Sequence, residues 1–181
     1  LMRSSAASDV YKRQSLGRDA KIRVLLLDQD GSIYHKEKDA GEGYPGELDY
    51  YEEPQGWVIV NEVPLEEYLR FVVPSEMPAS YALEALKAQA VVLRTSLCRE
   101  LAENEEKTAT EKYLTHAEMK RKWGAANFDT YLKKYTKAVE DTEGTVVWYN
   151  EACAWTPYHQ SSNGETRNAS EVLGTEDYPY I

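Results

Sequence analysis

The sequence has few residues that bind metals and no surplus of basic charge. Only two cysteines and three histidines occur among 181 residues. Cys98 and Cys153 lie far apart in the chain, and the histidines share no spacing typical of metal ligands, so we predict neither a metal site nor a cofactor. A disulfide is an alternative for an exported protein, but the spacing does not support it, and two half-buried thiols are the simpler interpretation.

The net charge of −10 argues against nucleic-acid binding, which requires a basic surface. No stretch approaches the roughly 18 apolar residues needed to span a membrane. The aromatic residues are 14 tyrosines and 4 tryptophans against only 2 phenylalanines. Such side chains suit stacking on sugar rings, and they suit ordinary half-buried packing equally well.

Both ends of the chain look incomplete or foreign to the fold. Residues 1–14 show no apolar periodicity, and we interpret them as a non-native or disordered leader. Residues 15–181 are predicted to form a single domain. The final residues YPYI resemble part of a strand, so we expect this domain to be truncated at its C-terminus.

Apolar runs at residues 22–28 and 57–60 predict strands, and the first ends in a turn at Asp30–Gly31. Between them, residues 36–55 are expected to form a loop with a short edge strand. Pro64 suits the first turn of a helix whose apolar face includes Leu65, Leu69 and Val72. The sequence PSEMP then predicts a break in that helix.

A second helix is expected after a cap at Ser80, with apolar residues at helical spacing from Leu83 to Leu101. Thr115 and Glu118 have the spacing of a capping box. Further predicted features are a helix stop at Gly124, a helix capped by Asp129, and a hairpin formed by residues 145–149 and 152–156. This order predicts an α+β fold with two central amphipathic helices packed against short strands and a C-terminal β-hairpin.

Glu76 is the strongest candidate for chemistry because it lies in the proline-flanked break between two apolar helix faces. Desolvation disfavours a charged carboxyl group, and a protonated one can act as a general acid. The alternative is an exposed loop glutamate or a helix cap. Lys87, Gln89 and Arg94 on the next helix are expected on its solvent-facing side.

The polar loop YHQSSNGET, residues 158–166, combines hydroxyl groups, an imidazole and a glycine. Such loops bind sugars, phosphates and peptide backbones alike. A nucleophile pair of His159 with Ser161 or Ser162 is conceivable, although no acid partner is indicated. On its own this pattern does not select one chemistry.

Together these segments resemble the sporulation stage II protein D family. The resemblance is carried by blocks at residues 60–69, 76–78, 84–90 and 94–95, within VNEVPLEEYLRFVVPSEMPASYALEALKAQAVVLRT. AVEDTEGTVVWYNEACAWTPYHQSSNGET resembles the family's ending, and IRVLLLD resembles its opening strand. The resemblance covers most of the chain after about residue 20, with a looser match over residues 104–135.

The resemblance implies a peptidoglycan lytic transglycosylase, which cleaves the bond between N-acetylmuramic acid and N-acetylglucosamine and leaves a 1,6-anhydro end. Glu76 would be the catalytic acid and base, and no second carboxylate would be needed to activate water. Residues at other family positions are expected around the substrate: Lys87, Tyr158, His159, Ser161, Ser162, Gly164 and Thr166. Tyr81 is a further candidate for stacking.

The resemblance also implies an extracytoplasmic protein on the cell-wall side of the membrane, whose native anchor or signal is absent from this fragment. Its expected partners are glycan strands, some stripped of stem peptides, together with a cell-wall amidase or engulfment proteins. An alternative is a non-catalytic module that enhances an amidase. Two departures are Asn163, where many members carry glycine, and the lack of cysteine around residues 113–124, from which we predict no structural zinc.

Overall fold

The computed structural model describes residues 20–28, 30–103, 108–109, 113–158 and 161–181. The predicted leader at residues 1–14 lies outside the described residues, and the domain start at residue 15 stays a prediction. The described chain is α+β, as predicted. Within it, no helix combines the length and the apolar character that crossing a membrane requires.

The main sheet has four strands in the order β2-β3-β1-β4. Strand β3 (Gly56–Pro64) pairs antiparallel with both β1 (Lys21–Leu25) and β2 (Glu47–Glu53). The short strand β4 (Thr108–Ala109), which the sequence did not predict, pairs parallel with β1. The edge strand expected within residues 36–55 is therefore β2, and the turn after β1 closes as predicted, with the Gly31 amide donating to the Asp28 carbonyl.

Helix α2 (Leu65–Glu76) begins directly after Pro64 and carries Glu66 and Glu67 in its first turn, where the helix dipole favours acidic side chains. The break predicted within PSEMP is present, but it begins at Met77, because Pro74 still lies inside α2. The Met77 amide donates to the Val73 carbonyl, which closes the last turn around the proline. Met77 then becomes extended, as expected for a residue before proline.

Helix α3 (Leu83–Glu103) starts later than predicted. Ser80 does not cap it, because the Ala85 and Leu86 amides both donate to the Ala82 carbonyl and set the helix start there. Two polar residues expected on its solvent-facing side, Gln89 and Arg94, are buried instead.

The capping box before α4 (His116–Trp123) is confirmed: the Thr115 hydroxyl accepts from the Glu118 amide, and the Glu118 carboxylate accepts from the Thr115 amide. Gly124 ends α4 with φ 75° and at once precedes α5 (Ala125–Glu140). Asp129 therefore lies inside α5 and does not cap it. Helices α2, α3 and α5 pack against one another around the buried core.

The predicted hairpin is present as β5 (Trp148–Tyr149) and β6 (Ala152–Cys153), with strands shorter than expected. Asn150 and Glu151 form its turn with positive φ angles of 46° and 64°. Helix α6 (Ala169–Leu173) follows, and the residues after it form turns in place of the strand predicted at YPYI.

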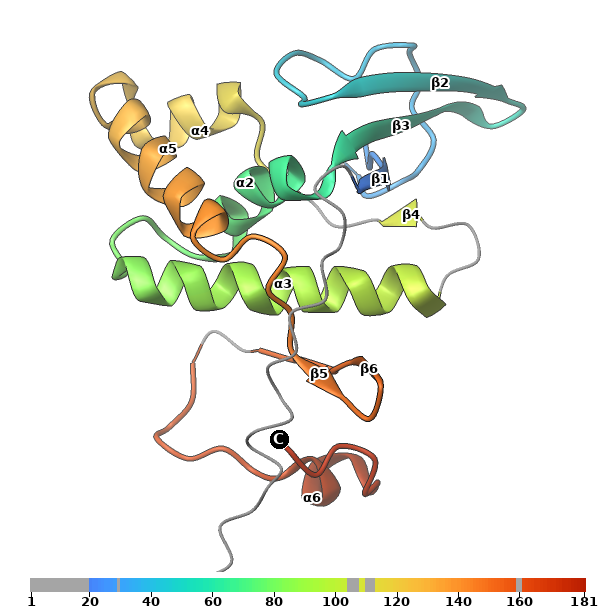
Figure 1. The fold of residues 1–181 in the computed structure, drawn as a ribbon. Helices are drawn as coiled ribbons and strands as arrows, with labels where there is room; N and C mark the ends of the chain where they lie inside the picture. The colour runs from blue at the N-terminus through green and yellow to red at the C-terminus, as the bar shows by residue number, and fades with distance from the viewer. Residues whose placement is uncertain (1–19, 29, 104–107, 110–112, 159–160) are drawn as a thin grey trace, which may run out of the picture.

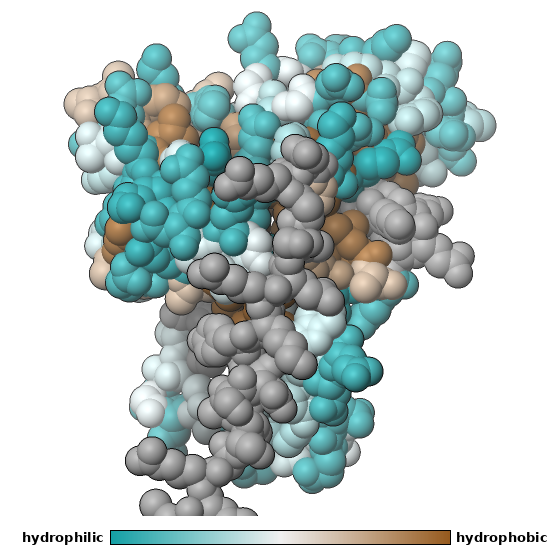
Figure 2. Space-filling model, in the orientation of Figure 1, coloured by the Kyte–Doolittle hydropathy of each residue, from teal (hydrophilic) through white to brown (hydrophobic). Residues whose placement is uncertain are grey.

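Helix α3 lies between two parts of the molecule (Figure 1). The sheet with α2, α4 and α5 lies on one side, and the hairpin with α6 lies on the other. Hydrophilic residues cover most of the described surface on the face that Figure 2 shows.

Candidate functional site

Glu76 is the last residue of α2 and is exposed. The apolar shelter predicted from the sequence is absent, because the buried face of α2 ends at Val73 and Pro74. Glu76 follows Val72 by one turn, so its carboxylate projects beyond the packed part of that face. The alternative prediction, that Glu76 is an exposed glutamate, is therefore correct about its solvent exposure.

The segment that follows Glu76 is held in place by α5. The Tyr135 hydroxyl donates to the Met77 carbonyl at 2.7 Å. The Lys134 ammonium group donates to the Ala79 carbonyl at 2.7 Å and to the Tyr81 carbonyl at 2.5 Å. Burial raises the pKa of Tyr135, so this phenol stays protonated as a donor. The backbone beside Glu76 is therefore fixed even though its side chain meets solvent.

Tyr158 joins the loop after β6 to the end of α2. Its hydroxyl donates a 2.5 Å hydrogen bond to Oε2 of Glu76. The Tyr158 side chain remains half exposed, as does that of Tyr81, so each has aromatic surface available for a ligand. The structure thus brings together two residues that lie 82 positions apart and that the sequence analysis assigned to one site.

A groove of about 680 Å³ extends from Tyr158 along the following loop and α6. Its lining includes three predicted substrate-binding residues besides Tyr158, namely Ser161, Ser162 and Thr166, and these are exposed. The groove is lined by Trp155, Pro157, Tyr158, Ser161, Ser162, Asn163, Glu165, Thr166, Arg167, Ala169, Val172, Leu173 and Ile181. It offers aromatic, hydroxyl and charged groups together, which is a combination suited to a polar ligand with apolar faces.

The other predicted residues of the loop do not line this groove or lie outside the description. Gly164 has φ 102° and donates its amide to the Ser162 hydroxyl at 3.3 Å, so glycine fits the left-handed turn at this position. Asn163 next to it does not need a positive φ, and the departure from the family pattern there leaves the turn intact. His159 lies outside the described residues, and its predicted role stays a prediction.

Lys87 is placed among acidic side chains. Its ammonium group contacts Glu84 and Asp141 at 2.9 Å each, and only 22% of its side chain is exposed. These contacts raise the pKa of Lys87, mainly through the hydrogen bond to Asp141. Lys87 thus ties α3 to the end of α5, and its role toward substrate stays a prediction.

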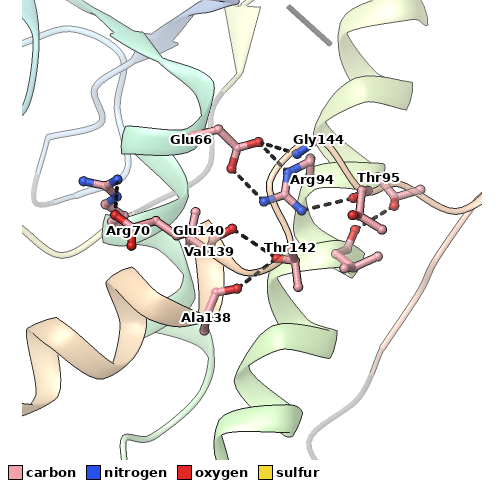
Figure 3. A network of polar contacts seen from close by, with 11 residues as sticks. Glu66, Arg70, Arg94, Thr95, Ala138, Val139, Glu140, Thr142 and Gly144 are labelled. Atoms are coloured by element: carbon pink, nitrogen blue, oxygen red, sulfur yellow. Dashed lines mark hydrogen bonds and ion pairs between the residues drawn. The ribbon is translucent and has the colours of Figure 1, made fainter. Parts of the chain in front are cut away.

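Sequence reasoning missed a buried polar network around Arg94 (Figure 3). The fully buried guanidinium group donates to both carboxylate oxygens of Glu66, at 2.8 and 2.7 Å, and to the Thr145 carbonyl at 3.0 Å. The Glu66 carboxylate also accepts from the Gly144 amide at 3.2 Å. The neighbouring Thr95 hydroxyl accepts from the Val147 amide at 2.9 Å. The network therefore fastens the chain leading into the hairpin onto α2 and α3.

Separate hydrogen bonds position the loop that carries Tyr158. Thr156, two residues before Tyr158, donates its hydroxyl to the Val92 carbonyl of α3 at 3.3 Å. The Trp155 amide donates to the Tyr180 hydroxyl at 2.9 Å. The Arg94–Thr95 pair was noticed in the sequence only as part of the resemblance, and its contacts now give it a structural role.

No group of three or more His, Cys, Asp or Glu side chains that could hold a metal ion occurs within the described parts of the chain. The described site is instead a carboxylate, a phenol and a groove. These groups can transfer a proton, donate hydrogen bonds to a ligand and stack against its apolar faces.

Comparison with known families decides the relationship. The model of the family described as "Stage II sporulation protein" matches residues 53–149, which is more than half of the chain. The chain belongs to this family. The matched region contains Glu76, the Arg94 network and the first strand of the hairpin.

Curated relatives agree with this membership. The chain is 39% identical over 133 residues to stage II sporulation protein D of Bacillus subtilis (strain 168), an alignment covering 67% of this chain and 38% of the relative. The Bacillus amyloliquefaciens protein of the same name is 35% identical with the same coverage. A protein named "Amidase enhancer" from Bacillus subtilis (strain 168) is 37% identical over 114 residues, 62% of this chain and 14% of the relative. The chain thus spans well under half the length of these relatives.

Proposed function

We propose that this stage II sporulation family chain is the catalytic part of a peptidoglycan lytic transglycosylase. Its substrate would be the glycosidic bond between N-acetylmuramic acid and N-acetylglucosamine, and its product a 1,6-anhydro-N-acetylmuramic acid end. Such a substrate implies a location on the cell-wall side of the membrane. A cell-wall role is supported by the family and by the relative named as an amidase enhancer.

One observation carries the enzymatic proposal. The exposed carboxylate of Glu76 accepts a hydrogen bond from Tyr158, and Tyr158 itself lines the groove formed with the loop at residues 161–167. A hydrogen bond from α5 fixes the backbone next to Glu76 at the end of α2, while the Glu76 side chain can reach a ligand. Solvent access suits a polymeric substrate, because a glycan strand must enter and leave an open cleft.

In the proposed reaction Glu76 acts twice. Its protonated carboxyl group donates to the glycosidic oxygen as the bond to the anomeric carbon breaks. The resulting carboxylate then accepts the proton of the muramic C6 hydroxyl, whose oxygen attacks the anomeric carbon and closes the anhydro ring. The proton returns to the enzyme, so the reaction consumes no water and one carboxyl group suffices.

The surrounding groups would hold and orient the sugars. Tyr158 donates to Oε2 of Glu76, while Oε1 accepts a longer 3.5 Å hydrogen bond from the Ser75 hydroxyl and would be the oxygen that transfers the proton. Trp155 and Tyr158 present ring surface to the groove, and Ser161, Ser162 and Thr166 present hydroxyl groups that can bond with sugar hydroxyls and acetamido groups. Glu165 also lines the groove, but this mechanism gives it no proton to carry.

A second candidate is a non-catalytic module that enhances a cell-wall amidase. The observation in its favour is the 37% identity to the protein of that name, together with the structural rather than catalytic role of the Arg94–Thr95 block. In this case the groove would bind glycan without cutting it, and Glu76 would matter only for position.

The experiment is digestion of purified peptidoglycan, with and without stem peptides, by the wild-type chain and by Glu76→Gln. Mass spectrometry of the soluble products is expected to show anhydro-muropeptides or anhydro-disaccharides with the wild type. Loss of the general acid and base is expected to reduce their yield by at least about 100-fold. The matched control is Glu165→Gln, which removes an exposed carboxylate that lines the groove; anhydro products should still form, because the mechanism gives Glu165 no proton to carry.

A parallel digestion with an added cell-wall amidase separates the two candidates. Faster release of stem peptides, without anhydro ends and unaffected by Glu76→Gln, would support the enhancer and overturn the enzyme. Thermal unfolding of each variant identifies any that fail through misfolding, because an exposed carboxylate should change stability little.

A further inference from the structure

The structure brings the two cysteines of the chain together. Cys98 lies on α3 and Cys153 on β6, and these elements pack against each other. Both thiols are free and half-buried, and they lie close enough to share a hydrogen bond. Residues 55 positions apart thus form one dithiol, which their sequence spacing did not indicate.

The hairpin has a fixed position on this face of α3. Arg94 and Thr95, one turn before Cys98, bind the Thr145 carbonyl and the Val147 amide just ahead of the hairpin. On β6 the pairing of Cys153 with Trp148 sets the register of the second cysteine. Hydrogen bonds from α3 hold the start of the hairpin, and strand pairing sets the place of Cys153 on β6. The approach of the two cysteines therefore does not depend on their own contact alone.

We propose that Cys98 and Cys153 form an intramolecular disulfide that covalently fastens the hairpin to α3. This inference is independent of the proposed glycan cleavage. The oxidant would be a disulfide reagent, either a small molecule of the glutathione class or a protein dithiol oxidase.

The two thiols differ in a way that orders the reaction. The hydrogen bond from Cys98, assisted by the charge of Arg99, lowers the pKa of Cys153. The same hydrogen bond, together with burial, raises the pKa of Cys98. The Cys153 thiolate therefore attacks the oxidant first, because the thiolate is the nucleophile in disulfide exchange.

The exchange balances in two steps. Cys153 forms a mixed disulfide with one sulfur of the oxidant and expels the other as a thiol. Cys98 then loses its proton and attacks the Cys153 sulfur, which expels the second thiol of the oxidant. The protein loses two protons and two electrons, and the oxidant disulfide is reduced to two thiols.

The disulfide would affect the loop after β6, whose Tyr158 contacts Glu76. Tyr158 lies five residues after Cys153, with the Thr156 hydroxyl bonded to α3 between them. A covalent bond at Cys153 would fix the base of this loop when its hydrogen bonds open. It would also reduce the conformational freedom of the unfolded chain.

The test uses the reduced, purified chain equilibrated with a mixture of oxidised and reduced glutathione, followed by intact mass measurement and peptide mapping without reduction. The expected product is a monomer lighter by two hydrogens, with the Cys98 and Cys153 peptides linked. Its melting temperature should exceed that of the reduced chain by about 10 °C, as expected for closing a loop of this length.

The variant Cys98→Ser is expected to stop at the first step and to retain one glutathione on Cys153. Cys153→Ser is expected to react more slowly, because burial still raises the pKa of the Cys98 thiol that it retains. Two glutathiones per wild-type chain, disulfide-linked dimers, or an unchanged dithiol would each overturn the proposal. These wild-type outcomes need no variant, so they remain decisive if a serine variant fails to fold.

Discussion

Replacing Arg94 with methionine tests whether the buried network of Figure 3 holds the two sides of α3 together. The change removes the paired hydrogen bonds to Glu66 and the bond to the Thr145 carbonyl. Breaking a buried ion pair by removing one partner typically costs about 3–5 kcal/mol. Glu66 retains 20% exposure of its side chain and the bond from the Gly144 amide, so we expect the lower end, about 3 kcal/mol.

Urea unfolding followed by circular dichroism measures this free energy. The matched control is Arg70→Met, which breaks an arginine–glutamate pair with Glu140 whose side chains are 36% and 56% exposed. That pair should contribute about 0–1 kcal/mol. If Arg94→Met were no more destabilising than Arg70→Met, the network would not have the structural role assigned to it. The double variant Glu66→Leu with Arg94→Met should be less destabilised than the sum of the single variants.

Two further substitutions and one labelling experiment test local features. Tyr158→Phe is expected to lower the rate of anhydro-product release by about 5-fold, because it removes one hydrogen bond that orients Glu76. A rate equal to that of the wild type would show that Tyr158 does not position Glu76. Thr115→Ala is expected to cost about 1 kcal/mol of unfolding free energy by urea titration, and a change near zero would contradict the role of the capping box. Iodoacetamide labelling of the reduced chain at a series of pH values should modify Cys153 at lower pH than an ordinary thiol, because its pKa is lowered. Cys98 should react only at higher pH, because its pKa is raised. Peptide mapping that found the reverse order would refute the assignment.

The parts of the fold that depend on neighbouring residues could be predicted from the sequence. The capping box of Thr115 and Glu118 needs only a spacing of three residues, and the hairpin turn at Asn150–Glu151 needs only two residues between apolar segments. The break predicted within PSEMP begins after Pro74, because a proline in the last turn removes a single backbone bond, which α2 tolerates.

The parts that depend on distant segments could not be predicted from pattern alone. Arg94 has helical spacing to Ala90 and Leu97 on the apolar face of α3, but its charge led to the expectation that it faces solvent. Its burial is explained by Glu66 and the Thr145 carbonyl, which lie in distant segments. Glu76 seemed sheltered because apolar residues flank it in sequence, yet the packed face of α2 ends one turn earlier. The contact between Cys98 and Cys153 likewise appears only once the hairpin is placed against α3.

The candidate site shows both cases together. The family resemblance brought Glu76 and Tyr158 onto one list, and the structure joins them by a hydrogen bond. The contribution of α5, through Tyr135 and Lys134, had no signal in the sequence because both residues have ordinary positions on an amphipathic helix.

The most direct test of the central claim is peptidoglycan digestion in water labelled with heavy oxygen, followed by mass spectrometry of the new glycan ends. Transfer of the C6 hydroxyl through Glu76 predicts anhydro ends that carry no heavy oxygen and that disappear with Glu76→Gln but persist with Glu165→Gln. New reducing ends that carry the label, or anhydro ends formed equally well by Glu76→Gln, would contradict the claim.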